Sequence, residues 1–507
     1  MLKKIRIGIS VVVFILITLL FLDFTSLIAP KFQILANIQF IPALLALNIA
    51  VVSVLIFVTL IFGRIYCSSV CPMGVYQDIV GWLSKRLNKR KRYTFSKAKT
   101  TLRWTILLVT VVSFLFGFTF LLGLLDPYGA YGRIATHLFR PAYLLGNNTL
   151  ESIFTFFGHH TFYKVGVYTL SIFSTIVSLL TLVGVGVLAW RNGRTYCNSL
   201  CPVGTLLGVL NKFSLFKIRF NEKCTLCGVC TKECKASCID FKSKTIDYSR
   251  CVNCFDCVDV CKFDAMSYSF SLKEKMGQQV EKHNLDDSKR RFLSVFAAII
   301  ALVTSKAIGN TATEPFRNKK PVVRKTPIAP PGATTFDKLD SKCVSCHLCV
   351  SRCPSHVLKP AFTEYGIGGI MQPVMNFDKG FCNYNCIICT QVCPTGALSK
   401  LDKEQKHHTQ MGQVQFVIEN CIVFTEETQC GACSEHCPTQ AVFMVPYKGN
   451  LTIPNTNINI CVGCGGCEYV CPAKPYKAIY VEGLTKQNTI TIKEEKREKV
   501  IIDDFGF

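Results

Sequence analysis

The chain has 507 residues, half of them apolar, and a formal net charge of +24. This length predicts two to four structural units, and the mean hydropathy of +0.31 is high for a soluble protein. The charge does not indicate a nucleic-acid partner, because much of the excess Lys and Arg lies beside long apolar runs, where basic residues set membrane orientation. The 29 cysteines stand at metal-ligand spacings, which excludes a disulfide framework as well.

Residues 1–210 are predicted to form a membrane-spanning α-helical bundle of four helices. A helix needs about 20 mostly apolar residues to cross a bilayer. Four runs meet this condition: residues 7–29, 40–62, 104–125 and 165–190. Lys and Arg are abundant in residues 64–103 and scarce in residues 126–163, so the positive-inside rule predicts that the N-terminus, residues 64–103 and the chain just after residue 191 are cytoplasmic. A signal peptide would resemble the first run, but that run is longer than a signal's apolar core and lacks an A-x-A site.

A nearly duplicated motif follows the second and the fourth of these runs. Residues 63–74 and 193–204 share the pattern G-R-x-Y-C-x3-C-P-x-G, which predicts a duplicated two-helix unit. The four cysteines of the repeat are Cys67, Cys71, Cys197 and Cys201. Thiolates brought together by such symmetry can ligate one metal or a seventh cluster, or act as two redox dithiols. The alternative is a structural role at the helix ends.

Residues 211–275 are predicted to form a cytoplasmic α+β ferredoxin domain with two [4Fe–4S] clusters. Two runs have the spacing C-x2-C-x2-C-x3-C, in which the fourth cysteine of each run serves the other cluster. The expected ligand sets are Cys224, Cys227 and Cys230 with Cys261, and Cys251, Cys254 and Cys257 with Cys234. A zinc site does not need a third and a fourth cysteine at these spacings in two successive runs, so the pattern disfavours zinc. Lys235 and Lys262 replace the proline that usually follows the fourth cysteine, and Cys238 is left over as a core thiol.

Residues 286–310 resemble a second export signal within the chain. The stretch from Ser288 to Ser294 reads S-K-R-R-F-L-S, and apolar residues follow to about Ser305. It is similar to a twin-arginine signal in which Lys289 replaces the first arginine, and that pathway exports folded, cofactor-bearing domains. The apolar part is short for a fifth transmembrane helix, and the alternative is a basic tether at the membrane surface. Residues 311–335 follow as a linker rich in Pro and Lys.

Residues 336–507 are predicted to form a four-cluster ferredoxin-like domain on the periplasmic side. Its four motifs are Cys343, Cys346, Cys349 and Cys353; Cys382, Cys386, Cys389 and Cys393; Cys421, Cys430, Cys433 and Cys437; and Cys461, Cys464, Cys467 and Cys471. Exchange of cysteines between motifs is expected, so the pairing stays open. Residues 343–347 also match the haem-attachment pattern C-x-x-C-H, but a haem there would leave Cys349 and Cys353 without a role.

These motifs resemble those of a known pair of proteins. Residues 1 to about 285 resemble NapH-type quinol-oxidising membrane subunits in their four apolar runs, two C-x3-C-P motifs and ferredoxin tail. The remainder resembles NapG/MauM-type ferredoxins in its twin-arginine-like start, the segment Pro330-Pro331-Gly332-Ala333 and its four cluster motifs. The resemblance covers nearly the whole chain, as a fusion of the two partners. It implies a protein of the bacterial inner membrane that passes electrons from the quinone pool to a periplasmic reductase or cytochrome c.

The sequence therefore predicts an electron conduit with six [4Fe–4S] clusters and no catalytic residue of its own. Electrons would enter from quinone in the lipid bilayer, or from a soluble donor at the cytoplasmic ferredoxin domain. His137, His159 and His160 lie in the outer loop and are candidates for contact with quinone or a partner's haem; the alternative is that they are solvated. An assembly factor for copper oxidases is the second hypothesis, which the four-cluster extension disfavours. A redox sensor is the third hypothesis, and the absence of a recognisable signalling domain from the sequence argues against it.

Overall fold

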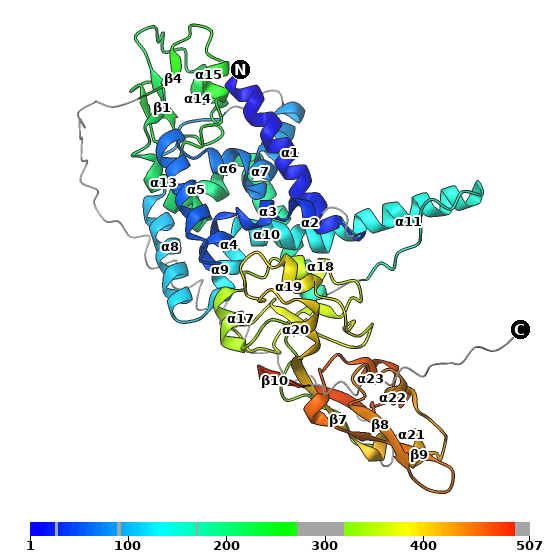
Figure 1. The fold of residues 1–507 in the computed structure, drawn as a ribbon. Helices are drawn as coiled ribbons and strands as arrows, with labels where there is room; N and C mark the ends of the chain where they lie inside the picture. Colours follow the sequence, from blue (N-terminus) through cyan, green and yellow to red (C-terminus); the bar gives the residue numbers. More distant parts are fainter. Residues whose placement is uncertain (26–28, 89–92, 169–170, 271–318, 492–507) are drawn as a thin grey trace, which may run out of the picture.

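The computed structural model describes residues 1–25, 29–88, 93–168, 171–270 and 319–491. Three parts follow one another along the long axis of the molecule (Figure 1). A helical domain lies in the middle, a small ferredoxin domain covers one of its ends, and a larger C-terminal module covers the other. The twin-arginine-like segment at 286–310 lies outside the described residues, as does the start of the predicted linker.

The helical domain contains helices α1 to α13 and two π-helical turns. Their bounds are α1 (Leu2–Leu22), α2 (Ala29–Phe32), α3 (Ile34–Asn37), α4 (Phe40–Leu45), α5 (Ile49–Phe62), α6 (Ile65–Ser69), α7 (Pro72–Leu87), α8 (Thr100–Leu115), α9 (Thr119–Leu125), α10 (Pro127–Ile134), η1 (Ala135–Phe139), α11 (Arg140–Phe156), α12 (Ile172–Asn192), η2 (Tyr196–Leu200) and α13 (Pro202–Asn211).

Two of the four predicted spans are continuous helices and two are interrupted. Among the described residues, α1 and α12 are long and apolar enough to cross a membrane. The second predicted span is divided into α4 and α5 at Leu47, and the third into α8 and α9 at Gly117; both residues have positive φ. A left-handed residue ends the run of helical hydrogen bonds. Each of these two apolar runs was therefore predicted as one span from its hydropathy but forms two shorter helices.

Helix α1 reaches from one end of the helical domain to the other. Near its start the Lys3 ammonium lies 2.8 Å from Asp259 of the ferredoxin domain. Directly after its end the Asp23 carboxylate lies 2.8 Å from Arg352 of the C-terminal module. The 21 residues of α1 are about 32 Å long at 1.5 Å per residue. The two cluster-bearing parts are therefore held about one bilayer core apart.

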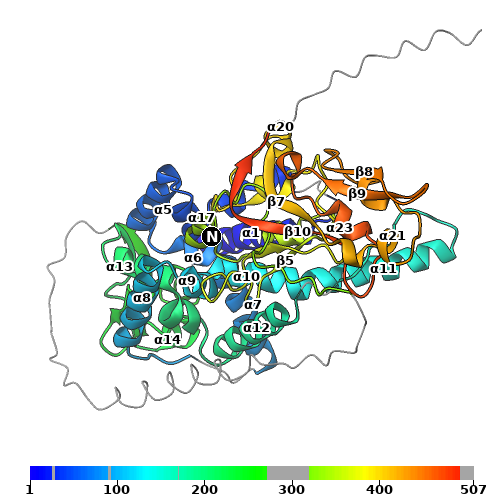
Figure 2. The ribbon, with the colours of Figure 1, turned by 90° about the horizontal axis from the view of Figure 1, so that it is seen from below.

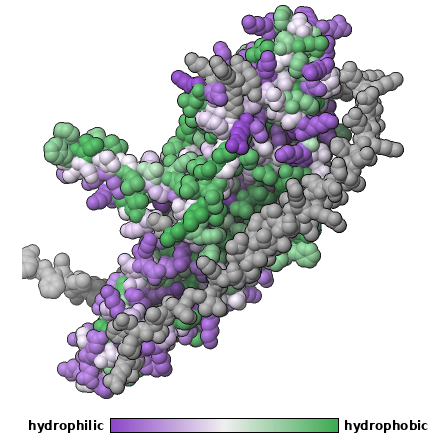
Figure 3. Space-filling model, turned by 180° about the vertical axis from the view of Figure 1, so that it is seen from behind, coloured by the Kyte–Doolittle hydropathy of each residue, from purple (hydrophilic) through white to green (hydrophobic). Residues whose placement is uncertain are grey.

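Exposed apolar side chains form a belt across the middle of the molecule. Figure 3 shows apolar side chains gathered there, with hydrophilic ones at both ends. The residues of this belt come chiefly from α1, α5, α8 and α12 and include Ile9, Val12, Phe57, Leu108, Leu115, Leu180 and Val183. Trp104 and Trp190 are also exposed, at the ends of their helices next to the ferredoxin domain. A large exposed apolar surface of this kind is typical of a contact with lipid or with another protein.

The ferredoxin domain is α+β, as predicted. Its outer strands β1 (Phe216–Phe220) and β4 (Met266–Phe270) pair antiparallel, and the short strands β2 (Ile239–Asp240) and β3 (Thr245–Ile246) form a second pair. Helices α14 (Val229–Glu233) and α15 (Asp256–Asp259) each follow the first two cysteines of a motif. Two equivalent halves thus face each other around one small core.

The C-terminal module consists of two lobes built in the same way. The first holds α17 (Phe336–Lys342), α18 (Leu348–Ser351), β5 (Leu358–Pro360), β6 (Pro373–Met375) and α19 (Ile388–Val392). The second holds α20 (Lys403–His407), β7 (Thr409–Phe416), η3 (Ile418–Asn420), α21 (Ile422–Thr425), α22 (Ala432–Glu435), β8 (Val442–Pro446), β9 (Thr452–Thr456), η4 (Ile458–Ile460), α23 (Gly466–Val470) and β10 (Ile479–Thr489). Strand β10 pairs antiparallel with β7, and β8 with β9.

The described part of the predicted linker packs on this module. The Arg324 side chain donates to the Val481 carbonyl of β10 at 2.8 Å, and the Gly483 amide donates to the Thr326 carbonyl at 3.1 Å. Gly332 lies close to the Ser399 backbone, where a Cβ atom would stand 2.4 Å from the Ser399 oxygen. Its φ of +81° also favours glycine. The P-P-G-A segment is thus a tight turn that joins the linker to the first lobe.

Candidate iron–sulfur sites

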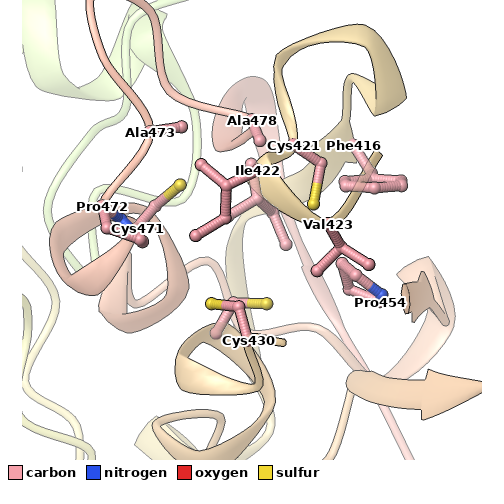
Figure 4. Close-up of a pocket in the computed structure, with 12 residues that line it drawn as sticks. Phe416, Cys421, Ile422, Val423, Cys430, Pro454, Cys471, Pro472, Ala473 and Ala478 are labelled. Carbon is pink, nitrogen blue, oxygen red and sulfur yellow. The ribbon is translucent and has the colours of Figure 1, made fainter. Parts of the chain in front are cut away.

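The cysteines of the motifs assemble into groups of four, here called quartets. Each quartet takes three cysteines from one motif and the fourth from the neighbouring motif. Three quartets line cavities. Cys224, Cys227, Cys230 and Cys261 line one of about 770 Å³; Cys353, Cys382, Cys386 and Cys389 line one of about 350 Å³; Cys421, Cys430, Cys433 and Cys471 line one of about 360 Å³. The third is drawn in Figure 4, where Cys421, Cys430 and Cys471 converge on one space from separate segments. In each quartet three cysteines come from one motif and one from its neighbour.

The other three quartets follow from the thiols that interact in the core. The stronger thiol neighbours of Cys257 are Cys251, Cys254 and Cys234; those of Cys349 are Cys343, Cys346 and Cys393; those of Cys467 are Cys461, Cys464 and Cys437. Each central thiol has one further and weaker thiol neighbour from the adjacent quartet, namely Cys230, Cys389 and Cys433 respectively. Burial raises the pKa of each of these three central thiols, and the neighbouring thiolates raise it further. Four buried thiolates without a cation repel one another, so cationic iron is the counterpart that this donor set fits.

The structure thus brings together both ligand sets predicted for the ferredoxin domain. It also gives the pairing that the spacing left open in the C-terminal module, where the first motif exchanges with the second and the third with the fourth. Within the described residues, no three His, Cys, Asp or Glu side chains are arranged around a single metal ion. Ligation itself remains a prediction for all 24 of these cysteines.

The backbone of four motifs curls around the cluster position in the same way. The second and fourth residues after the first cysteine have positive φ in each of them: Leu226 and Gly228, Asn253 and Phe255, Ser345 and His347, Gly463 and Gly465. These left-handed residues turn amide groups toward sulfur, and the Ser345 and Gly463 amides each donate to a cysteine sulfur at 3.4 Å. Hydrogen bonds to the sulfur ligands raise a cluster's reduction potential.

The replacement of a proline by Lys235 has a structural reason that the spacing did not reveal. The Lys235 ammonium lies 3.0 Å from Asp256 and 3.6 Å from Asp78 of α7. Its carbonyl accepts a hydrogen bond from the Arg194 amide at 2.9 Å. A lysine here attaches the ferredoxin domain to the helical domain, which a proline would not do.

Cys238 lies against two cluster ligands. Its sulfur is 3.5 Å from that of Cys234, and it also interacts with Cys251. The hydrogen bond with Cys238 lowers the pKa of the Cys234 thiol. The left-over thiol of the sequence is therefore a sulfur neighbour of the Cys251 quartet rather than a remote core residue.

The two C-x3-C-P motifs meet in the centre of the helical domain. All four of their cysteines are buried. The two halves are related by pseudo-twofold symmetry: Arg194 donates to the Cys67 carbonyl at 2.7 Å, and Arg64 donates to the Cys197 carbonyl at 3.5 Å. Gly74 and Gly204 occupy matching positions, where a Cβ atom would lie 2.2 and 2.0 Å from those same carbonyls. The repeated glycines are thus required by close backbone contact.

The charge around this central quartet is asymmetric. Arg194 pairs with Asp78 at 2.8 Å. Arg64 is fully buried, its Nη2 lies 3.8 Å from the Cys67 sulfur, and its Nε has no hydrogen-bond partner. Among the described residues no carboxylate pairs with Arg64. Its Nη1 donates to Asn198 Oδ1 at 3.3 Å and to the Ser249 carbonyl at 3.0 Å, but these acceptors are neutral. A buried charge without a counter-charge is costly, so the site favours an anionic group held by the four sulfurs.

The first C-terminal motif is pressed against the far end of the helical domain. The Val344 carbonyl lies over Gly123 and Gly129, where a Cβ atom would approach within 2.9 and 2.8 Å. Arg133 donates to the Ser345 carbonyl at 3.2 Å. His137 Nε2 is 2.8 Å from Nδ1 of His347, and both rings are buried. Of the three outer-loop histidines, His137 thus joins two domains, whereas His159 and His160 are exposed.

Models of iron–sulfur families match several parts of the chain. A model described as a 4Fe-4S binding domain matches residues 44–90 and 172–221, the segments that carry the two C-x3-C-P motifs. A 4Fe-4S dicluster domain matches residues 428–475, and a further 4Fe-4S binding domain matches residues 251–265. No solved structure matches the chain.

Several curated proteins are similar to parts of the chain. The ferredoxin-type protein NapG of Escherichia coli K12 is 31% identical over 153 residues, which are 28% of this chain and 65% of NapG. NapF of the same strain, also a ferredoxin-type protein, is 27% identical over 154 residues, 30% of this chain and 85% of NapF. The methylamine utilization ferredoxin-type protein MauM of Methylobacillus flagellatus is 27% identical over 206 residues, 39% of this chain and 86% of MauM.

The quartets and these matches define an electron-transfer protein of the iron–sulfur class with multiple [4Fe–4S] sites. Within that class the chain is similar to 4Fe–4S ferredoxin-type proteins of the Nap and Mau kind, which confirms the NapG/MauM part of the predicted resemblance. The NapH-type part, residues 1 to about 285, stays a prediction.

Proposed function

We propose that this protein carries electrons across the bacterial inner membrane, from quinol to a periplasmic reductase or cytochrome c. The observation that carries the proposal is one continuous buried core. It contains Cys254 of the ferredoxin domain, all four C-x3-C-P cysteines, and Cys346 of the C-terminal module. Electron carriers must lie in close succession, and this core joins three cysteine sites that are far apart in the sequence.

The central quartet is the link in this succession, and we assign it a seventh iron–sulfur cluster. On one side Arg64 contacts both the Cys67 sulfur and the Ser249 carbonyl, two residues before the first cysteine of the Cys251 quartet. On the other side the Tyr196 hydroxyl donates to the Leu125 carbonyl at 2.9 Å, and the neighbouring Asp126 interacts with Cys346. The match of residues 44–90 and 172–221 to a 4Fe-4S binding domain supports the assignment.

A membrane around the helical domain accounts for three independent features. The belt is apolar, α1 has the length of a bilayer core, and the two cluster-bearing parts lie at opposite ends. The basic residues Lys85 and Arg86 at the end of α7 lie on the ferredoxin side, where Lys85 pairs with Glu233. The positive-inside rule then favours a cytoplasmic ferredoxin domain and a periplasmic C-terminal module.

The proposal is tested on the full chain purified in detergent. Iron analysis is expected to give about 28 atoms per chain with the seventh cluster and about 24 without it; fewer than about 16 would contradict even the six-cluster prediction. Menadiol, a lipid-soluble quinol, is expected to reduce the clusters. Reduction by a soluble donor alone would contradict quinol oxidation. A C-terminal reporter fusion active only in the cytoplasm would contradict the periplasmic placement.

A further inference from the structure

A fully buried lysine lies beside one of the cluster sites of the C-terminal module. Lys406 is on α20, the short helix at the junction of the two lobes, next to the start of β7 (Figures 1 and 2). Its side chain is 0% exposed, its Nζ atom has no hydrogen-bond partner, and no carboxylate pairs with it within the described residues. A buried charge without a counter-charge is costly, so this ammonium requires an anion close by.

The other buried charges of the C-terminal module are paired. Within the described part of this module, Arg352 and Glu468 are the other buried side chains that carry a full charge. Arg352 pairs with Asp23, and Glu468 pairs with Arg324. Lys406 therefore differs from both, because its counter-charge does not come from a carboxylate.

The anion available to Lys406 is the Cys382 quartet, which consists of Cys353, Cys382, Cys386 and Cys389. Burial raises the pKa of the Cys382 and Cys389 thiols, and the positive charge of Lys406 acts on both in the opposite direction. A cluster held by four thiolates is an anion, and its net charge is one of the factors that set its potential. The loaded cluster thus supplies the counter-charge that the protein itself does not.

Contacts on both sides of Lys406 hold its helix against the segment that carries these ligands. The His407 ring stacks on the ring of Tyr384, which lies between two cysteines of the quartet, with the centroids 3.9 Å apart. Before the helix, Gln391 Nε2 donates to the Leu401 carbonyl at 2.7 Å. The position of the ammonium is therefore fixed by neighbouring residues and does not depend on a bond of its own side chain.

A second buried cation lies beside the same quartet and comes from the helical domain. Arg140, at the start of α11, is 6% exposed and interacts with the Cys353 thiol. Its Nε has no hydrogen-bond partner, and Arg140 lines a small cavity together with Thr136 and His356. Within the described residues no carboxylate pairs with Arg140. Its positive charge therefore adds to that of Lys406 at this quartet.

The Cys382 quartet stands between two other cluster sites. On the side of the helical domain, Cys389 is a neighbour of Cys349 in the Cys343 quartet. On the other side, the Cys382 amide donates to the Cys464 carbonyl at 2.9 Å, and Cys464 belongs to the Cys461 quartet. An electron that leaves the helical domain through the Cys343 quartet therefore reaches the Cys382 quartet next.

We propose that Lys406 raises the reduction potential of the cluster in the Cys382 quartet and thereby draws electrons out of the helical domain to the junction of the two lobes. The inference rests on the proposed function for the direction of electron flow. In the step concerned, the Cys343 cluster is oxidised and the Cys382 cluster is reduced by a single electron; no bond breaks, and Lys406 keeps its proton. A fixed cation in a buried site stabilises the reduced form, because that form is the more negative one.

The test is an EPR-monitored redox titration of the detergent-purified full chain with dithionite. Lys406→Met is expected to lower the equilibrium constant for reduction of one cluster about tenfold or more, equivalent to about 59 mV or more for one electron. Lys406→Arg keeps the charge and is expected to keep most of the potential. Lys403→Met removes an exposed lysine from the same helix and is the matched control, expected to match the wild type. Cys386→Ser identifies the EPR signal of this quartet.

The outcomes are decided by which signal moves. An unchanged potential in Lys406→Met at full iron content would overturn the inference, and so would a shift of a signal that Cys386→Ser leaves unaltered. If Lys406→Met loses the cluster while Lys406→Arg retains it, the cluster requires the charge, as expected of its charge partner. Loss of the cluster in Lys406→Arg as well would mean that the site requires the shape of lysine, which overturns the inference.

These titrations also separate the inference from the proposed function, because they use no quinol. If menadiol fails to reduce the wild type while Lys406→Met still lowers the potential of this cluster, quinol oxidation is wrong and the role of Lys406 at its cluster stands. If menadiol reduces the wild type and the potential does not depend on Lys406, the inference alone is wrong.

Discussion

The ferredoxin domain and the C-terminal module use the same exchanged quartets but attach to the helical domain in different ways. The ferredoxin domain attaches through partly accessible charges, such as Lys3 with Asp259 and Lys235 with Asp78. The C-terminal module attaches through close backbone contacts over glycines and one ion pair, Asp23 with Arg352, whose side chains are 1% and 2% exposed. Glycines also lie against the ferredoxin domain, where Cβ atoms on Gly193 and Gly208 would stand 2.3 and 2.4 Å from the Lys235 and Ser249 carbonyl oxygens. The polar interface of the ferredoxin domain therefore differs from the dry interface of the C-terminal module in the exposure of its ion pairs.

The outermost quartets differ in a related way. Cys227 of the ferredoxin domain is exposed and its quartet lines a cavity of about 770 Å³, whereas Cys421, Cys433 and Cys471 of the outer C-terminal quartet are buried and line a cavity of about 360 Å³. Solvent exposure is one of the factors that set a cluster's potential. The ferredoxin quartet is thus more accessible to solvent than the outer quartet of the C-terminal module.

The largest effect is expected from removing the central quartet. The double variant Cys67→Ser/Cys197→Ser is expected to lose about four iron atoms per chain and to slow electron passage between the two ends by at least about a hundredfold, because the remaining sites lose their link. Iron analysis and the rate of C-terminal cluster reduction by a soluble donor at the ferredoxin domain measure this. Unchanged iron and rate would show that the quartet is structural.

The dry interface is tested by breaking its ion pair. Arg352→Met removes the cation beside the buried Asp23 carboxylate, which keeps its hydrogen bonds from Thr25. The variant is expected to destabilise the docked module by about 3–5 kcal/mol, measured by denaturant unfolding and by protease sensitivity of the junction. Lys448→Met breaks an exposed pair with Glu427 and is the matched control, expected to change stability by about 0.5 kcal/mol or less. The double variant Asp23→Leu/Arg352→Met is expected to recover most of the loss, and equal losses in both would contradict the explanation.

A smaller effect is expected at the polar interface. Lys235→Pro restores the residue usual for ferredoxins and removes the contacts with Asp78 and Asp256. It is expected to weaken docking of the ferredoxin domain by about 1–2 kcal/mol, while both of its clusters remain. Lys262→Pro makes the same change away from the interface and serves as the control. Loss of a cluster in Lys235→Pro alone would instead give Lys235 a role in cluster assembly.

The smallest effect is expected from the sulfur neighbour of the Cys251 quartet. Cys238→Ala removes a weak donor to Cys234 and is expected to lower the potential of that cluster by about 20–40 mV, equivalent to roughly 0.5–1 kcal/mol for one electron. An EPR-monitored redox titration measures it, with the Cys224 quartet of the same molecule as the internal reference. Loss of the cluster would mean that Cys238 is itself a ligand.

The cysteine quartets of the ferredoxin domain were predictable because ligand spacing is a local property of the chain. A C-x2-C-x2-C run can surround one cube only by curling its backbone, and the left-handed residues at Leu226 and Asn253 do so. The α+β class of this domain followed from the same motifs. Hydropathy located the helical domain but not the breaks at Leu47 and Gly117, since a turn inside an apolar run leaves its composition unchanged.

What the sequence by itself determined is the set of groups that can hold iron and the duplication of the C-x3-C-P unit. Only the tertiary structure decided that the two copies meet around Arg64, that His137 reaches His347, and that Thr136, Arg140 and His356 share one cavity. Apart from Thr136 and Arg140, which lie one helical turn apart, these contacts join residues separated by more than a hundred positions. No local pattern records them, because they depend on how α1, α10 and α11 pack against a module that folds from the far end of the chain.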